Sequence, residues 1–513
     1  MVKQSSPALE LGEIGCPDSN NDVANYGDSM AGWADRWNTV LTYVAALIAP
    51  VIYFSYVDHY GVDSFFFDVY QTFAAMNAAI HHQPVGGLIW QQDTEGRQVL
   101  SNAAFAGFAV LDHANVRAIL LFSALVLALS YVLLLALYRH YIGSRLTPLP
   151  VLVIGLVWFS LADVGNALFA YQLSCYFVLL SVVVMFYALL VPNRHRTLWF
   201  AIGVVAAICS SLSFLNGFLA WPLGLVCILW TRPRTRRTTY EVAAWLIAVL
   251  CLGAIYFRGY RATGCAPIAN CSIGDSLSHP VAMIRVFLVL LGGVLPGGYY
   301  GPEVHDTTRF EVLGAALLAG AVFIIIQSWR HRSTREAMPL PMLLVLFGLL
   351  WDAMIALGRT GYGVDLVIGV NRYVMPNIVL LTGLAMYALA QAPRLLRASK
   401  GNTRSTALTW LTLSLLALFL LVQIAQSTDF GLVNGAAAQR MFTLDARLWV
   451  NLDRVPIADR SCEVDQVLWA GLYDAKAPRI PVEDHLGEFG PSAYSYYRAM
   501  GPPPLDPSCV KRG

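Results

Sequence analysis

Apolar stretches of about 20 residues, nearly devoid of charge, recur along most of this 513-residue chain. A helix that crosses the hydrocarbon core of a bilayer needs about 20 mostly apolar residues, because each residue advances it by about 1.5 Å. Only 13% of the residues are charged and 57% are hydrophobic, whereas a soluble domain carries about 25% charged residues. This pattern excludes a soluble enzyme, a disordered scaffold and a nucleic-acid-binding protein. It predicts an all-α polytopic membrane protein.

Eleven stretches satisfy this length rule. They cover residues 38–57, 116–138, 149–168, 170–191, 198–215, 217–230, 242–257, 309–329, 340–358, 370–392 and 407–427. A further apolar segment, 281–299, contains a helix-breaking cluster of glycines around Pro296. We expect this segment to be re-entrant or interfacial; two short spans are the alternative.

Arginines and lysines gather in every second connection between these stretches. The basic clusters are Arg139 with Arg145, Arg194 with Arg196, residues 232–237, residues 330–335 and residues 394–404. Short loops rich in Lys and Arg stay in the cytoplasm. We therefore expect a cytoplasmic tail over 1–37, a transmembrane domain over 38–427 with a large first outer loop at 58–115, and an outer tail over 428–513.

Cysteines divide between spans and outer segments under this topology. Cys265 and Cys271 share one outer loop, and Cys462 and Cys509 share the outer tail. An oxidising exterior would allow each pair to form a disulfide. Neither a Cys-x-x-Cys nor a His-x-x-x-His spacing indicates a metal site.

Ionisable residues concentrate in the first outer loop, where they are candidates for chemistry. Asp68 follows Asp63 in an apolar, aromatic setting that would desolvate its carboxylate and suit a catalytic base. Further along, Asp93, Glu95 and Arg97 lie within five residues of one another and could bind sugar hydroxyls or a divalent cation. Solvated loop carboxylates and a surface ion pair are the structural alternatives.

Polar residues also mark the outer ends of later spans. They are Asp163, Asn166, Gln172, Asn216, Trp221, Arg285, Asp352, Arg372 and Tyr373. Arginine presents a fork of donors that matches phosphate oxygens, and a carboxylate beside it can act as base. This grouping favours chemistry on a phosphorylated lipid at the outer leaflet. Alternatively, Asp163, Arg285 and Arg372 pair with one another for structural reasons.

Five stretches, in order between residues 40 and 392, resemble motifs of bacterial membrane glycosyltransferases of the GT-C type. They are Phe67-Asp68-Val-Tyr70, Asp93-Thr-Glu95-Gly-Arg97, Gly165-Asn166 with Tyr171-Gln172, Asn216 to Pro222, and Gly358-Arg359 with Asn371-Arg372-Tyr373. The second lacks both histidines and the Asn of the family motif, and the third lacks its Glu. The Asn-Gly-x-x-x-Trp-Pro motif at Asn216 is intact.

This resemblance implies a GT-C-like fold of 11 to 13 transmembrane helices, with membrane-parallel helices in the first periplasmic loop. It implies an inverting hexosyl- or pentosyltransferase of the bacterial inner membrane that builds cell-envelope glycans. The donor would be a polyprenyl-phosphate sugar and the acceptor a glycan or glycolipid. Asp68 would be catalytic, whereas the substrate-binding residues would be Asp63, Tyr70, Asp93, Glu95, Arg97, Asn166, Gln172, Asn216, Trp221, Arg285, Arg359, Arg372 and Tyr373. No cofactor is implied, and a divalent cation stays open.

Three other readings remain. A transporter or flippase of lipid-linked sugars would have matched broken helices in its two halves, whereas only the 281–299 segment is broken. A polysaccharide polymerase or ligase would carry its large outer loop late in the chain, and here that loop comes first. A structural membrane subunit would leave the aromatic setting of Asp68 and the arginines at the outer span ends unexplained.

Overall fold

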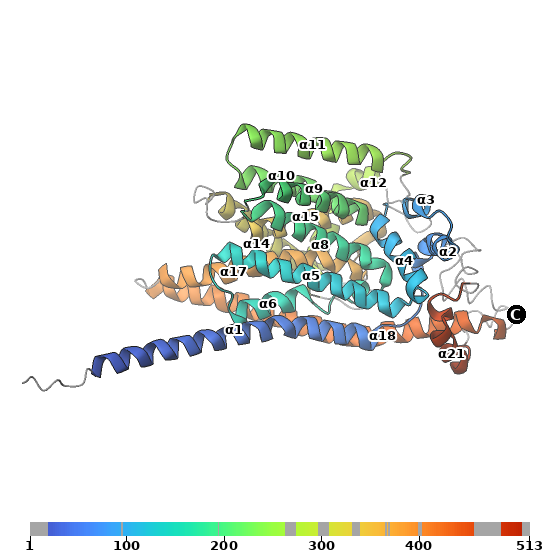
Figure 1. Ribbon diagram of the computed structural model, residues 1–513, viewed down its shortest axis with the longest axis horizontal. Coiled ribbons are helices and arrows are strands. Elements are labelled where there is room, and N and C mark those ends of the chain that lie inside the picture. The colour runs from blue at the N-terminus through green and yellow to red at the C-terminus, as the bar shows by residue number, and fades with distance from the viewer. Residues whose placement is uncertain are drawn as a thin grey trace, which may run out of the picture.

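The computed structural model of the chain is helical throughout its described part (Figure 1). It describes residues 19–93, 96–192, 194–261, 273–295, 307–330, 339–364, 367, 370–398, 403–455 and 484–504. Within these ranges there is no strand, and the single bridge between Asp93 and Gly96 is isolated. The predicted all-α class is confirmed. The four outer cysteines and Glu95 lie outside the described residues.

Nine helices of the described residues are long and apolar enough to cross a bilayer. They are α1 (Ser19–Tyr60), α5 (Val116–Ile142), α8 (Leu173–Leu190), α9 (Arg196–Ser213), α11 (Arg236–Tyr256), α14 (Thr308–Arg330), α15 (Leu340–Arg359), α17 (Met375–Ala398) and α18 (Thr403–Val450). Each corresponds to one of the eleven predicted stretches. Their number and composition are those of a multi-pass membrane protein.

Two predicted spans are shorter than expected. The 149–168 stretch forms α6 (Pro148–Trp158), which ends before a turn at Ser160–Asp163, and then the short α7 (Val164–Ala167). The 217–230 stretch forms α10 (Ala220–Thr231), preceded by the 3-10 turn η3 (Leu215–Leu219). Buried polar side chains in these connections, Asp163 and Asn216, accompany the breaks. The apolar 281–299 segment begins as α13 (Pro280–Gly292).

Helix α18 continues 23 residues past the predicted end of the last span at 427. Its glycines allow close approach to the neighbouring elements: a Cβ at Gly431 would lie 2.6 Å from the Leu161 carbonyl oxygen, and one at Gly435 would lie 2.7 Å from the Tyr56 hydroxyl. The Tyr56 hydroxyl donates to the Gly431 carbonyl at 3.0 Å. The hydropathy rule sees only apolar runs and therefore ended the span at 427, whereas the more polar residues that follow continue the helix.

The most buried long helix is α8, which packs against α5 and α9, while α15 packs against α17. Peripheral helices α1, α11 and α18 expose large apolar side chains such as Leu47, Leu250 and Leu421. Exposed apolar surface of this extent is typical of contact with lipid tails.

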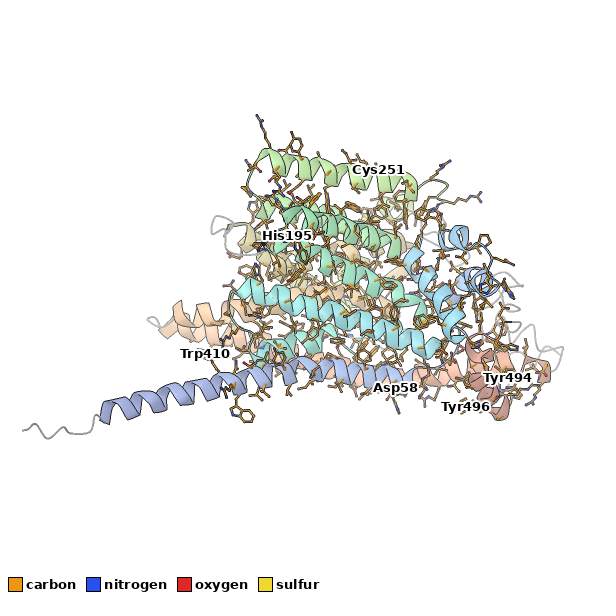
Figure 2. The ribbon with its side chains drawn as sticks, in the orientation of Figure 1. Asp58, His195, Cys251, Trp410, Tyr494 and Tyr496 are labelled. Atoms are coloured by element: carbon orange, nitrogen blue, oxygen red, sulfur yellow. The ribbon has the colours of Figure 1, made fainter. Side chains whose placement is uncertain are left out.

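One end of the helical bundle, called here the loop end, carries the short helices of the first loop (Figure 1). These are η1 (Phe67–Thr72), α2 (Phe73–Ile80), α3 (Gly86–Ile89) and α4 (Val99–Asp112). The C-terminal residues 484–504, with α21 (Pro491–Met500), lie at the same end. At the opposite end, called here the arginine end, His195 precedes α9 (Figure 2), and Arg196, Arg232 and Arg237 surround Glu241.

Candidate functional site

Asp68 lies in the first turn of η1 and is buried, with 9% of its surface exposed. The chain enters η1 through Phe66 in an extended conformation. Phe66 packs its ring against Phe169 and Phe442. These contacts fix the start of the turn. The Asp68 Oδ2 atom lies 3.4 Å from Arg372 Nη1. Two residues that the sequence grouped only by motif therefore form an ion pair.

The backbone of Arg372 is held by a buried amide. Asn166, in α7, donates from Nδ2 to the Arg372 carbonyl oxygen at 2.9 Å and to Asp163 Oδ1. Asn166 and Asp163 are both buried. Arg372 belongs to the 3-10 turn η6 (Asn371–Val374), which precedes α17. Asn166 therefore positions the arginine and is separated from bulk solvent.

A second arginine joins this cluster at the end of α15. Arg359 Nε donates to the Tyr373 hydroxyl at 3.1 Å, and its guanidinium lies 5.1 Å from the centroid of the Tyr362 ring. The Arg372 guanidinium lies 5.9 Å from the Tyr373 ring centroid. Tyr373 thus contacts both arginines, and Arg359, Arg372 and Tyr373 lie together; their substrate-binding role stays a prediction.

Asp93 provides a second buried carboxyl group in the first loop. Its Oδ2 accepts a hydrogen bond from Asn102 Nδ2 at 3.0 Å, and its Oδ1 has no hydrogen-bond partner among the described residues. Burial raises the pKa of Asp93 to about 7, and the negative charge of Asp68 adds to this shift. A carboxyl group with this pKa can exchange a proton near neutral pH.

Asp63 and Tyr70, also predicted to bind substrate, make structural contacts. Asp63 Oδ1 accepts from the Val116 backbone amide at 2.7 Å at the start of α5. Burial raises the pKa of Asp63 to about 6. The Tyr70 hydroxyl accepts from Trp449 Nε1 at 3.1 Å, which joins η1 to α18.

Arg97 connects the first loop to the end of α11. Its guanidinium donates to the backbone carbonyls of Trp90 (2.6 Å), Tyr256 (2.8 Å) and Arg258 (2.9 Å). With 6% of its surface exposed, Arg97 directs its donors into protein backbone. This geometry gives Arg97 a structural contact, and its predicted contact with substrate stays a prediction.

The remaining predicted residues lie in separate contacts. Gln172 accepts from Cys175 Sγ at 3.4 Å, and Asn216 is buried in η3. Trp221 donates to Ser211 Oγ at 3.0 Å. Arg285 pairs with Glu311 at 2.8 Å, and its side chain is half exposed. Among the described residues, Arg285 pairs with Glu311 and Arg372 pairs with Asp68. The alternative in which Arg285, Asp163 and Arg372 pair with one another is therefore not observed there.

Sequence reasoning missed two contributors to the site. Asn102 holds Asp93 from α4, and Tyr362 stacks on Arg359. The helical spacing of buried polar residues at the start of α4 was the available signal for Asn102. In the described part of the chain, no three His, Cys, Asp or Glu side chains gather as a metal site would require.

No family model, curated protein or solved structure matches the chain. The geometry itself offers a carboxyl–arginine pair and a second arginine that contacts the same tyrosine, Tyr373. It also offers a buried carboxyl group, that of Asp93, whose pKa is raised to about 7. Such a set can bind an anionic group and accept a proton in the same place.

Proposed function

We propose that this chain is an inverting GT-C-type glycosyltransferase that uses a polyprenyl-phosphate sugar and modifies a glycan or glycolipid outside the bacterial inner membrane. The observation that carries the proposal is the partly buried ion pair of Asp68 with Arg372, beside Arg359 and Tyr373. The carboxylate can accept the proton of the acceptor's hydroxyl group, and the two arginines can stabilise an anionic leaving group.

In the proposed reaction, an acceptor hydroxyl oxygen attacks the anomeric carbon as the bond from that carbon to the carrier phosphate breaks. The hydroxyl proton passes to Asp68, and the electron pair of the broken bond stays on the phosphate. Arg372 and Arg359 stabilise the charge that develops there, as guanidinium groups do for phosphate oxygens. One displacement of this kind inverts the anomeric centre.

The ion pair also suggests how donor binding prepares the base. In the structure, the side chains of Asp68 and Arg372 form an ion pair. A lipid phosphate that binds Arg372 would compete with Asp68 for the guanidinium donors. The carboxylate would then be released to accept the acceptor proton, so that the base becomes active only when the leaving group is in place.

The test is complementation of a strain that lacks the gene, with envelope glycans profiled by mass spectrometry. Asp68→Asn should abolish the glycan product at a normal protein level. The matched control is Asp58→Asn, because Asp58 is an exposed carboxylate near the end of α1 that pairs with Arg117 at the start of α5. Normal glycans with Asp68→Asn would remove Asp68 from the base role. An unchanged glycan profile in the deletion strain would overturn the function itself.

A transporter of lipid-linked sugars is the second candidate, because α15 contains a fully buried carboxylic acid. Asp352 is 0% exposed, and neither of its carboxylate oxygens has a hydrogen-bond partner among the described residues. Ionisable residues within spans often mark ion or proton pathways. If Asp352→Asn abolishes the glycan product and Asp68→Asn does not, transport replaces transfer as the function.

A further inference from the structure

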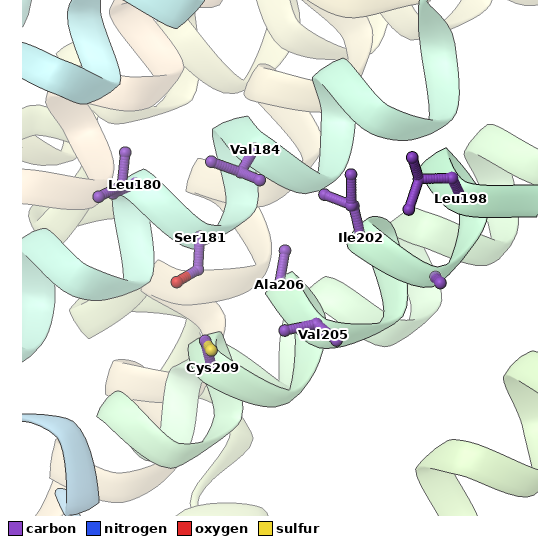
Figure 3. Close-up of a pocket in the computed structure, with 9 residues that line it drawn as sticks. Leu180, Ser181, Val184, Leu198, Ile202, Val205, Ala206 and Cys209 are labelled. Carbon is purple, nitrogen blue, oxygen red and sulfur yellow. The ribbon is translucent and has the colours of Figure 1, made fainter. Parts of the chain in front are cut away.

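An apolar groove lies between α8 and α9, and none of its lining residues belongs to the Asp68 site. It has a volume of about 450 Å³ and contains one polar hydroxyl, that of Ser181 (Figure 3). Its lining residues are Leu180, Ser181, Val184, Leu198, Ala201, Ile202, Val205, Ala206 and Cys209. From Leu198 to Cys209 the groove follows α9 for about 16 Å. That length is close to one leaflet of the hydrocarbon core, about 15 Å.

The groove begins at the arginine end, two residues after Arg196. Between residues 192 and 241 the chain has six arginines and a single acid, Glu241. Arg196 and Arg237 lie 2.6 Å and 3.6 Å from Glu241, and Arg232 also pairs with it. Three guanidinium groups around one carboxylate leave a surplus of two positive charges before Arg194, Arg234 and Arg236 are counted.

One of these arginines contacts the residue that precedes the groove in the chain. Arg237 Nη2 donates to the Thr197 hydroxyl at 2.8 Å, and Thr197 is adjacent to Leu198 at the mouth of the groove. Arg194 is exposed and lies in the turn that precedes α9, four residues before Leu198 in the chain. The positive charges of Arg194 and Arg237 therefore lie at the end of an apolar groove about as long as one acyl chain.

Aromatic side chains also lie at the arginine end of the bundle. Trp199 packs against Tyr187 with ring centroids 5.6 Å apart, and Trp230 packs against Trp329 at 5.9 Å. Tryptophan and tyrosine are enriched at the depth of lipid headgroups. The arginines at this end would thus lie where the phosphates of the leaflet are found, and the positive-inside rule predicts that this leaflet is cytoplasmic.

We propose that the α8–α9 groove and the arginines at its mouth bind an anionic glycerophospholipid. One acyl chain lies in the groove, and the headgroup phosphate contacts Arg237 and Arg194. Charge complementarity selects this occupant, because a zwitterionic headgroup would bring an ammonium group toward a surface with surplus positive charge. The proposal does not depend on the glycosyltransferase function.

Native mass spectrometry of the full chain in detergent tests the site, with phosphatidylglycerol and phosphatidylcholine of identical acyl chains as probes. The wild type should retain phosphatidylglycerol at least tenfold better. The double variant Arg194→Gln/Arg237→Gln should lower this retention to the phosphatidylcholine level. Arg145→Gln is the matched charge control, because Arg145 lies in another basic connection and pairs with Asp35.

Filling the groove tests the acyl chain separately. Ala201→Trp, or the milder Ile202→Phe if that variant folds poorly, should reduce retention of phosphatidylglycerol at least tenfold. Ala243→Trp on the exposed face of α11 is the control. Equal retention of the two lipids, unchanged retention in the double arginine variant, or displacement by soluble glycerol phosphate alone would each overturn the proposal.

Discussion

Asp68 and Arg372 are 304 residues apart in the chain, and their side chains lie 3.4 Å apart at the loop end. The pair joins the first loop to the turn before α17. Because both side chains are largely buried, removal of either leaves the other charge partly desolvated. The same contact therefore affects stability as well as the proposed chemistry, and the two effects need separate measurements.

Substitutions should distinguish the role of Arg372 from that of Arg285, which the sequence also predicted to bind substrate. Arg372→Gln should abolish the glycan product, and Arg372→Lys should retain a small fraction because it keeps charge without the donor fork. Arg285→Gln should leave the product within about twofold, since Arg285 is half exposed and pairs with Glu311. Glycan profiles normalised to protein level are the measurement. Equal losses for Arg285→Gln and Arg372→Gln would contradict the assignment.

We expect Arg97 to stabilise the folded chain. Arg97→Ala leaves three backbone carbonyls without their donors and should lower the free energy of unfolding by about 2–4 kcal/mol. Arg97→Lys should recover only part of this loss. Thermal unfolding in detergent measures the effect, with Arg117→Ala as an exposed control expected to change it by less than about 1 kcal/mol. Normal stability of Arg97→Ala would favour the predicted role in substrate binding.

The sequence predicted the long helices well, because a hydropathy rule depends on composition alone. Nine of eleven stretches became long apolar helices. The hydropathy rule predicted one span over 149–168, but α6 ends at Trp158. The turn that follows, which contains Asp163, is stabilised by a network of buried groups that no local pattern reveals. The side chains of Asp163 and Tyr176 are hydrogen-bonded. The Tyr176 hydroxyl in turn lies 2.6 Å from the Tyr53 hydroxyl in α1.

The candidate site was only partly predictable for the same reason. Asn166 was recognised as a buried polar residue at a span end, but its partner is a backbone carbonyl 206 residues away. Arg97 carried a plausible charge and spacing, yet its donors are directed to the end of α11. Residue type indicates what a side chain can bind. The three-dimensional neighbours decide whether those donors are already used.

Asp93 should make stability depend on pH. Its pKa is raised to about 7 in the folded chain, so its favourable contribution is complete below the ordinary Asp pKa of about 4 and is lost as pH rises through 7. Asp93→Asn removes this titration while keeping an acceptor for Asn102. The stability of the variant relative to wild type should therefore rise by about 2–3 kcal/mol between pH 5 and pH 8. Parallel pH profiles of unfolding for the two proteins would rule this out.

Glu488 should couple docking of the C-terminal segment 484–504 to pH. Its Oε2 accepts from the Phe65 backbone amide at 2.9 Å, and burial, together with the charges of Asp63 and Asp445, raises its pKa to about 8. The buried tyrosines Tyr70 and Tyr497 face the same group. Since the pKa is raised, docking is favoured while Glu488 is protonated and weakens as pH rises through 8.

Hydrogen exchange of peptides from 484–504 measures this docking between pH 6 and pH 9, after correction for intrinsic exchange. Protection should fall in the wild type as the pH rises from 6 to about 8 and then level off. It should stay nearly constant in Glu488→Gln, which keeps the acceptor and removes the charge. Glu311→Gln, in the ion pair with Arg285, is the control and should behave as wild type. The same loss of protection in Glu488→Gln would assign the pH dependence to another group.

The close contact of α13 with α14 gives a stability prediction with a control in the same helix. A Cβ added at Gly314 would lie 1.9 Å from the Leu288 carbonyl oxygen, whereas one added at Gly320 meets no atom within 4 Å. Small residues let helix backbones approach closely in membranes, and a methyl group here must push the two helices apart. Gly314→Ala should therefore lower the unfolding temperature in detergent clearly, and Gly320→Ala should leave it unchanged or raise it slightly, because alanine favours helix. If the two variants unfold at the same temperature, the contact between α13 and α14 does not contribute to stability as this geometry requires.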